Sequence, residues 1–109
     1  MSTTHYLKTA PVYFDAQKRG DKTFEIRRDD RGYQKGDTLV LCKYGKGRGY
    51  SGIGFLDERG SAVSDFPDSD NVEKITCEVL WILTGGQHGI KPGYVVMATK
   101  PINSKEVGE

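Results

Sequence analysis

The sequence predicts an α+β protein that is mostly β, built as a small, partly closed β-barrel with one main helix packed beside it. One strong helical pattern occurs early in the chain, and the segments after it alternate apolar and polar residues with a period of two. Short turn-rich separators divide these segments. Four to six short strands would leave exposed edges in a flat sheet, and closure into a barrel removes such edges.

Size and composition favour one domain over residues 1–109, because 109 residues can bury about two thirds of the unfolded surface. Sixteen basic and fifteen acidic residues nearly cancel, so net charge alone does not indicate a nucleic-acid partner. Cys42 and Cys77 lie in apolar runs without a CxxC pair, and we expect reduced core thiols, no metal and no cofactor. With no leader or long apolar run, we expect a cytoplasmic monomer without membrane association.

The helix is expected over Pro11–Arg19, since proline is tolerated in a first helical turn and Thr9 could cap it. Gly20 suits a left-handed helix stop, and the basic residues just before it suit the negative end of the helix dipole. Strands are expected after this helix at Thr23–Arg28, Thr38–Tyr44, Lys74–Leu83 and Tyr94–Lys100.

Two of these strands carry further expectations. In the strand at 74–83, Trp81 shares a face with Ile75, Cys77, Val79 and Leu83, and we interpret that face as core. In the strand at 23–28, Phe24 and Ile26 share one face while Thr23, Glu25 and Arg27 share the other. That polar face is either solvated or lines a site.

The glycine-rich stretch at about 45–71 is longer than most loops in compact domains, which are usually short unless functional or disordered. Phe55-Leu56 and Ala62-Val63 could form a small hairpin within it, and the tail at 103–109 is polar enough to fray. Over residues 43–50, at the entry to this stretch, cations and tyrosines alternate on a glycine-rich backbone, a composition that can stack bases and follow a phosphate chain but is equally typical of a flexible loop. The residues that could bind there are Lys43, Lys46, Arg48 and Tyr50.

Several short motifs together resemble the ASCH group of PUA-like domains, over nearly the whole chain. They are His5-x-Leu7-Lys8, Tyr13-Phe14, Gly20-x-Lys22-Thr23-x-Glu25-x-Arg27, Asp30-Arg31, Gly36-Asp37 and Lys91-Pro92-Gly93-Tyr94-Val95-Val96. The sequence is most similar to a subfamily of small stand-alone bacterial and bacteriophage proteins described as a domain of unknown function.

The resemblance implies a small barrel with a helix beside the Lys22 motif and a nucleic-acid-binding cleft next to that helix. Some ASCH relatives are ribonucleases, and others are amidohydrolases acting on acylated cytidine. Those amidohydrolases place a lysine and a threonine in this motif and a glutamate in a later helical insertion. Lys22 matches the lysine, whereas Glu25 stands at the threonine position and the segment at 85–89 is too short for the insertion.

Lys22 and Glu25 could form a structural ion pair, a binding clamp or an acid/base pair, and the sequence does not separate these uses. In a clamp, Glu25 would accept hydrogen bonds from base amino groups or orient Arg27. His5 could titrate near neutrality in a site or simply lie near the chain start.

We therefore expect a nucleic-acid-binding module, for RNA or a single-stranded substrate, with a cleft lined by Lys8, Lys22, Glu25, Arg27 and Tyr94. One alternative is a small hydrolase of a modified nucleoside or of RNA that uses Lys22 and Glu25 as catalytic residues. Another is a phage factor that binds a host protein through the segment at 45–71.

Overall fold

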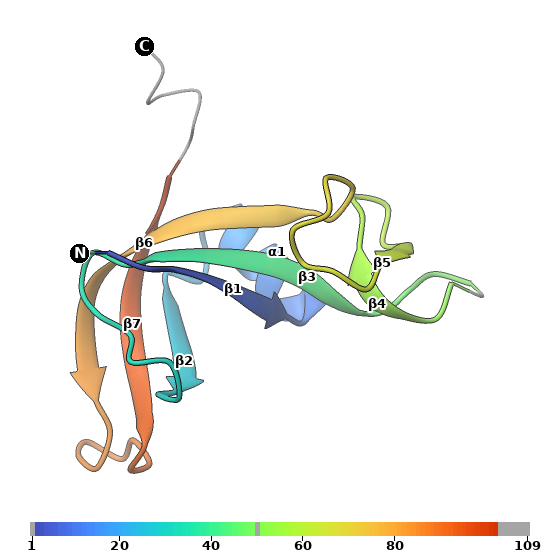
Figure 1. Ribbon diagram of the computed structural model, residues 1–109. Helices are drawn as coiled ribbons and strands as arrows, with labels where there is room; N and C mark the ends of the chain where they lie inside the picture. Colours follow the sequence, from blue (N-terminus) through green and yellow to red (C-terminus); the bar gives the residue numbers. More distant parts are fainter. Residues whose placement is uncertain (1, 50, 103–109) are drawn as a thin grey trace.

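The computed structural model describes residues 2–49 and 51–102, and the tail expected to fray lies outside them. The helix and the strands of this part of the chain follow one another in the order β1 (Thr4–Thr9), α1 (Pro11–Arg19), β2 (Phe24–Arg28), β3 (Thr38–Lys46), β4 (Ile53–Leu56), β5 (Ala62–Ser64), β6 (Lys74–Thr84) and β7 (Tyr94–Pro101) (Figure 1). The predicted α+β, mostly β class is confirmed, and the helix has the predicted bounds.

The strands form one curved, mixed sheet in the order β2-β7-β6-β3-β4-β5, with β1 pairing in parallel with β3. The other pairings are antiparallel. The first part of β3 lies between β1 and β6, and its last residues pair with β4 in an extension that projects from the body of the molecule (Figure 1). Strands β4 and β5 form the hairpin at the positions suggested by the sequence.

The barrel is only partly closed, because β1 and β2 face each other without a backbone ladder. Side chains reach β1 instead: Arg27 Nη2 on β2 donates to the Lys8 carbonyl at 3.0 Å, and Arg31 Nη1, in the segment after β2, donates to the Tyr6 carbonyl at 3.1 Å. We call this line between β1 and β2 the seam. It lies beside α1 (Figure 1).

Helix α1 begins with Pro11 and ends at Gly20, whose φ of 86° is in the left-handed region that glycine adopts most readily. Its N-cap is Ala10, without a side-chain cap hydrogen bond. The prediction that Thr9 caps it is wrong, because Thr9 still belongs to β1 and its hydroxyl donates to the Leu7 carbonyl. The helix buries Phe14 and Gln17 against the barrel.

The main core lies inside the barrel and under α1. Fully buried side chains from the helix and from four strands form it, and they include Leu7, Phe14, Leu39, Leu41, Val79, Val95 and Met97. A second cluster of Val40, Cys42, Phe55 and Val72 packs on the other face of β3. Because β3 is covered on both faces, it is apolar in consecutive residues rather than in alternation.

The prediction that Trp81 is core is wrong. A β-bulge interrupts the β6–β7 register between Val79, which pairs with Thr99, and Trp81, which pairs with Ala98. The extra residue shifts the alternation, so Ile82 rather than Trp81 and Leu83 packs against the core. Trp81 consequently lies on the outside and is 59% exposed.

Within residues 2–49 and 51–102, no helix has the length and apolar character needed to cross a membrane.

Candidate functional site

Strand β2 turns its charged face inward and its apolar face outward. Glu25 is 3% exposed, whereas Phe24 and Ile26 are 42% and 56% exposed. Burying a carboxylate and exposing two large apolar side chains is unfavourable unless the carboxylate is fully paired. The polar face of this strand is therefore turned inward and is not solvated.

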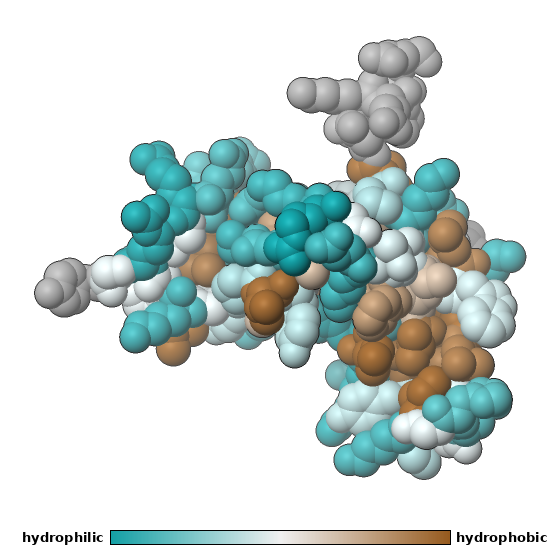
Figure 2. Space-filling view, turned by 180° about the vertical axis from the view of Figure 1, so that it is seen from behind, coloured by the Kyte–Doolittle hydropathy of each residue, from teal (hydrophilic) through white to brown (hydrophobic). Residues whose placement is uncertain are grey.

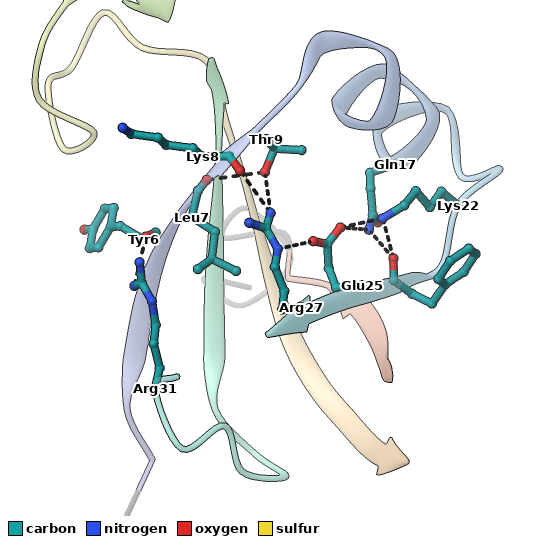
Figure 3. Close-up of polar contacts among 10 residues, drawn as sticks. Tyr6, Leu7, Lys8, Thr9, Gln17, Lys22, Glu25, Arg27 and Arg31 are labelled. Carbon is teal, nitrogen blue, oxygen red and sulfur yellow. Dashed lines mark hydrogen bonds and ion pairs between the residues drawn. The ribbon is translucent and has the colours of Figure 1, made fainter. Parts of the chain in front are cut away.

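Glu25 is satisfied by three donors (Figure 3). Its Oε2 accepts from Lys22 Nζ at 2.5 Å and from Gln17 Nε2 at 3.1 Å, and its Oε1 accepts from Arg27 Nε at 2.9 Å. Lys22 and Gln17 also donate to the Phe24 carbonyl, at 2.6 and 3.0 Å. Both carboxylate oxygens are thus occupied, and the carboxylate fixes the positions of two cations.

Arg27 is held at both ends of its guanidinium. Nε faces Glu25, while Nη2 reaches across the seam to the Lys8 carbonyl and to the Thr9 hydroxyl at 3.3 Å (Figure 3). The charged cluster of Lys22, Glu25 and Arg27 therefore ties β2 to α1 and to β1. It carries one net positive charge, because two cations share one carboxylate.

An open pocket of about 630 Å³ lies at this cluster, between the end of β1, α1 and β2. We call it the seam pocket; it is lined by Lys8, Thr9, Ala10, Tyr13, Ala16, Asp21, Lys22, Phe24, Glu25, Ile26 and Arg27. Two aromatic rings lie near Lys22: its Nζ is 5.0 Å from the Phe24 ring centroid and 6.0 Å from the Tyr13 ring centroid. Both rings are substantially exposed.

The cations of the cluster keep donor capacity for a ligand. Lys22 has three ammonium N–H groups, two of which are directed to Glu25 and Phe24. Arg27 has two N–H groups on Nη1, for which no hydrogen-bond partner is found among the described residues. The seam pocket can therefore offer charge-assisted hydrogen bonds to an anion or to the acceptor edge of a base.

His5 has a different environment. It is buried, its Nε2 lies 2.9 Å from Asp37 Oδ2, and its ring packs edge-on against Tyr33 at 4.8 Å. Asp37 also accepts from the backbone N–H groups of Thr3 and Gln34. Burial opposes ionisation of Asp37, but the hydrogen bonds from His5, Thr3 and Gln34 outweigh it and lower its pKa. This group fastens the start of β1 to the turn before β3 and does not line the seam pocket.

The remaining candidate residues also lie outside the seam pocket. Lys43 is 3.3 Å from Asp15 and 3.5 Å from Glu73, so acidic partners hold it on the other side of α1. The side chain of Arg48 donates to the Arg59 carbonyl, within the β3–β5 extension. Lys46 ends β3 and is exposed, while Tyr50 lies outside the described residues.

Tyr94 is placed at the start of β7, beside Arg28 rather than in the seam pocket. A hydrogen bond from Arg28, together with the positive charges of Arg28 and Lys91, lowers the pKa of the Tyr94 hydroxyl. The structure thus brings together four of the five residues expected in the cleft, namely Lys8, Lys22, Glu25 and Arg27.

Gln17 and Thr9 are site residues that the sequence reasoning missed. Gln17 is 4% exposed although it is polar, and it reaches Glu25 from the helix. Its sequence signal is its position on the apolar stripe of α1, three residues after Phe14, where a polar residue needs a buried partner. Thr9 gave no comparable signal, because its contact with Arg27 depends on how β1 and β2 approach each other.

Among residues 2–49 and 51–102, no group of three or more His, Cys, Asp or Glu side chains is arranged to hold a metal ion.

Fold and site together define a small α+β domain with a cationic pocket at the open seam of its barrel. Residues 4–58, about half of the chain, match the family described as "Domain of unknown function (DUF3850)". The chain belongs to this family, and the match includes β1, α1, β2 and with them the whole seam pocket.

The chain is also similar to a curated protein of Escherichia phage P2, described as "Uncharacterized 12.9 kDa protein in GpA 3'region". The two sequences are 40% identical over 47 residues, which is 43% of this chain and 43% of the phage protein. The similarity therefore spans less than half the length of that relative. It relates this small domain to a bacteriophage protein.

Proposed function

We propose that this protein is a nucleic-acid-binding module for RNA or another single-stranded substrate, which it binds in the seam pocket. The observation that carries the proposal is the use of Glu25: a buried carboxylate holds Lys22 and Arg27 in a pocket flanked by exposed aromatic rings. Such a carboxylate acts as a counter-ion that orients cations. The oriented cations are the binding groups.

Single-stranded nucleic acids present phosphates and unstacked bases together. Lysine and arginine bind the phosphates, and aromatic side chains stack on the bases with little dependence on sequence. Lys22 lies within 6.0 Å of the ring centroids of both Tyr13 and Phe24, so both kinds of contact are available within one pocket. Lys8 lines the same pocket from β1 and adds positive charge.

We also propose that the chain belongs to the ASCH group and acts in the cytoplasm. The group's fold, a small barrel with a helix beside the lysine motif, is supported by the position of α1 next to β2 and by the incomplete closure at the seam. Nothing in this placement supplies a substrate, because fold does not imply function.

The alternative of a hydrolase would require Glu25 to accept a proton from water or to act with Lys22 on an acyl group. Both of its oxygens already accept hydrogen bonds from cations and an amide, which favours binding over catalysis. Incubation with N4-acetylcytidine and with labelled RNA, followed by chromatography, separates the two. Product that forms with the wild type and is lost in Glu25→Gln would establish the hydrolase instead.

A protein partner is the other alternative, and its surface would be the segment at 45–71, where Ile53 is 71% and Phe66 is 69% exposed. This surface lies away from the seam pocket, so the two activities can be tested independently. Pull-down of a host protein that is lost in Ile53→Asp, while oligonucleotide binding is retained, would assign this segment to such a partner.

The test of the proposed function is fluorescence anisotropy with labelled single-stranded RNA over a range of salt concentrations. We expect binding that weakens with salt, and Lys22→Ala should lower the slope of log K against log salt by about 0.7, the value for one phosphate contact on a single strand. The control is Lys35→Gln, an exposed lysine outside the seam pocket, which should leave the slope unchanged. Absence of salt-sensitive binding to RNA and DNA oligonucleotides would refute the proposal.

A further inference from the structure

The outer face of strands β2, β7 and β6 is a second surface for which the seam pocket gives no use. Because β2 turns its charges inward, the apolar residues of β2 point outward, and the bulge in β6 turns Trp81 outward as well. Figure 2 shows apolar side chains gathered over this part of the molecule. The register places them in rows across the three strands.

One row is aromatic. Phe24 on β2 and Trp81 on β6 both pair with Ala98 on β7 between them. Neighbouring strands are about 4.8 Å apart, so the two rings rise from strands separated by about 10 Å, with only a methyl group between them. The two exposed rings therefore flank a small side chain in this row. The next row, Ile26, Val96 and Leu83, continues the apolar floor toward the seam-side end of β2.

Positive charges lie at the two ends of these rows. At the β2 C-terminal end, the Arg28 guanidinium and the Lys91 ammonium lie 5.8 and 5.9 Å from the Tyr94 ring centroid. At the other end, Lys100 on β7 lies opposite Glu78 on β6 in the strand register, so this end carries one charge of each sign. An apolar surface with exposed aromatic rings and cations at its ends is typical of sheets that stack single-stranded bases.

The outer face is continuous with the seam pocket. Phe24 and Ile26 line that pocket and also belong to the two rows of the outer face. A ligand that passes over β2 therefore contacts these side chains both in the seam pocket and on the outer face. Both residues belong to β2, which is an edge strand of the sheet formed by residues 2–49 and 51–102, so no further strand of this part separates the two surfaces.

We propose that the single-stranded nucleic acid held in the seam pocket passes over β2 onto this outer face, where its bases stack on Phe24 and Trp81 and its phosphates meet Arg28 and Lys100. This inference rests on the proposed function and adds a second binding surface to it. Stacking supplies affinity here without base-specific hydrogen bonds, so the surface prefers unpaired strands over duplex.

Trp81 is the one tryptophan in the sequence, which makes intrinsic fluorescence a direct reporter of this face. Titration with an unlabelled oligouridine of about 12 nucleotides should quench Trp81 emission. The quenching should saturate at the same oligonucleotide concentration as the anisotropy of a fluorescently labelled oligouridine of the same length. Trp81→Ala should weaken binding by about fivefold or more, and Trp81→Phe should restore most of it. Phe66→Ala, at an exposed aromatic residue outside these rows, is the matched control and should bind as the wild type does.

The outcomes separate the two proposals. Binding that Lys22→Ala weakens and Trp81→Ala leaves unchanged, without quenching, would overturn the outer-face inference and retain the seam pocket. Binding that Trp81→Ala weakens and Lys22→Ala leaves unchanged, with quenching of Trp81, would place binding on the outer face alone. If no oligonucleotide binds, both fail, and if sedimentation shows self-association that shields Trp81 from acrylamide quenching, the outer face belongs to a second copy of the chain.

Discussion

Replacement of Glu25 by glutamine tests the central ion cluster. Glu25 is 4% exposed in its side chain, and its two cationic partners, Lys22 and Arg27, are 15% and 25% exposed. Glu25→Gln keeps the shape of the side chain and removes its charge. Two partly buried cations then lie together without a counter-ion, and their mutual repulsion adds to the loss.

The expected cost follows from this burial. Removing one partner of a fully buried ion pair costs about 3–5 kcal/mol. Here the glutamine oxygen can still accept from Arg27 Nε, and both cations reach some water, so we expect a loss of about 2–3 kcal/mol in the free energy of unfolding. For a domain of this size, each kcal/mol lowers Tm by roughly 4 °C, giving a total decrease of about 10 °C.

Urea denaturation and thermal melting followed by circular dichroism measure this effect. The matched control is Asp21→Asn, which removes the carboxylate of an exposed pair with Arg19 whose side chains are 69% and 60% exposed. This exposed pair should contribute less than about 0.5 kcal/mol. If Glu25→Gln cost no more than this control, Glu25 would not be the anchor of the cluster, and the argument from its burial would be refuted.

Three further predictions concern other parts of the fold. Hydrogen bonds lower the pKa of Asp37 in the folded state, so its contribution to stability is present above its unfolded pKa of about 3.9 and is lost as pH falls through the lower folded value. Urea denaturation at several pH values should show this loss of unfolding free energy, and Asp37→Asn should reduce the dependence of that free energy on pH. Burial raises the pKa of the Cys42 and Cys77 thiols to about 11, so a thiol reagent at pH ~8 should label the unfolded but not the folded protein, and rapid labelling of the folded protein would contradict their placement. Gly85→Ala should cost about 1–3 kcal/mol, because its new Cβ would overlap the Lys91 and Tyr94 carbonyl oxygens, and an unchanged Tm would show that this turn can relax.

Local patterns predicted most of the fold. The helix limits followed from Pro11 and Gly20, and Gly93 in the turn at Lys91-Pro92-Gly93 has a φ of 85°, the positive value that a type II turn requires. The strands predicted at 23–28, 38–44, 74–83 and 94–100 end within two residues of β2, β3, β6 and β7, whereas β1 was not among the predicted strands.

Alternation did not predict which face of two strands points inward. In β6 a single bulged residue reversed the positions of Trp81 and Ile82, and a bulge leaves no residue signature in this segment. In β2 the inward face is the charged one, because Gln17 and the open seam supply partners for Glu25 that a single strand does not show. Long-range contacts, rather than propensity, decided both cases.

The candidate site divides in the same way. The motif that joins Lys22, Glu25 and Arg27 is local, so its residues could be placed together from the sequence. His5 and Lys43 could not be excluded from it in advance, because their partners Asp37 and Glu73 are distant in the chain.

The most direct test of the account is the salt dependence of single-stranded RNA binding by the wild type and by Lys22→Ala, measured by fluorescence anisotropy. The account predicts binding that weakens as salt rises, with a slope that Lys22→Ala lowers by about 0.7 while Lys35→Gln leaves it unchanged. Binding that is absent, or that is identical in the wild type and Lys22→Ala, would contradict a nucleic-acid site in the seam pocket.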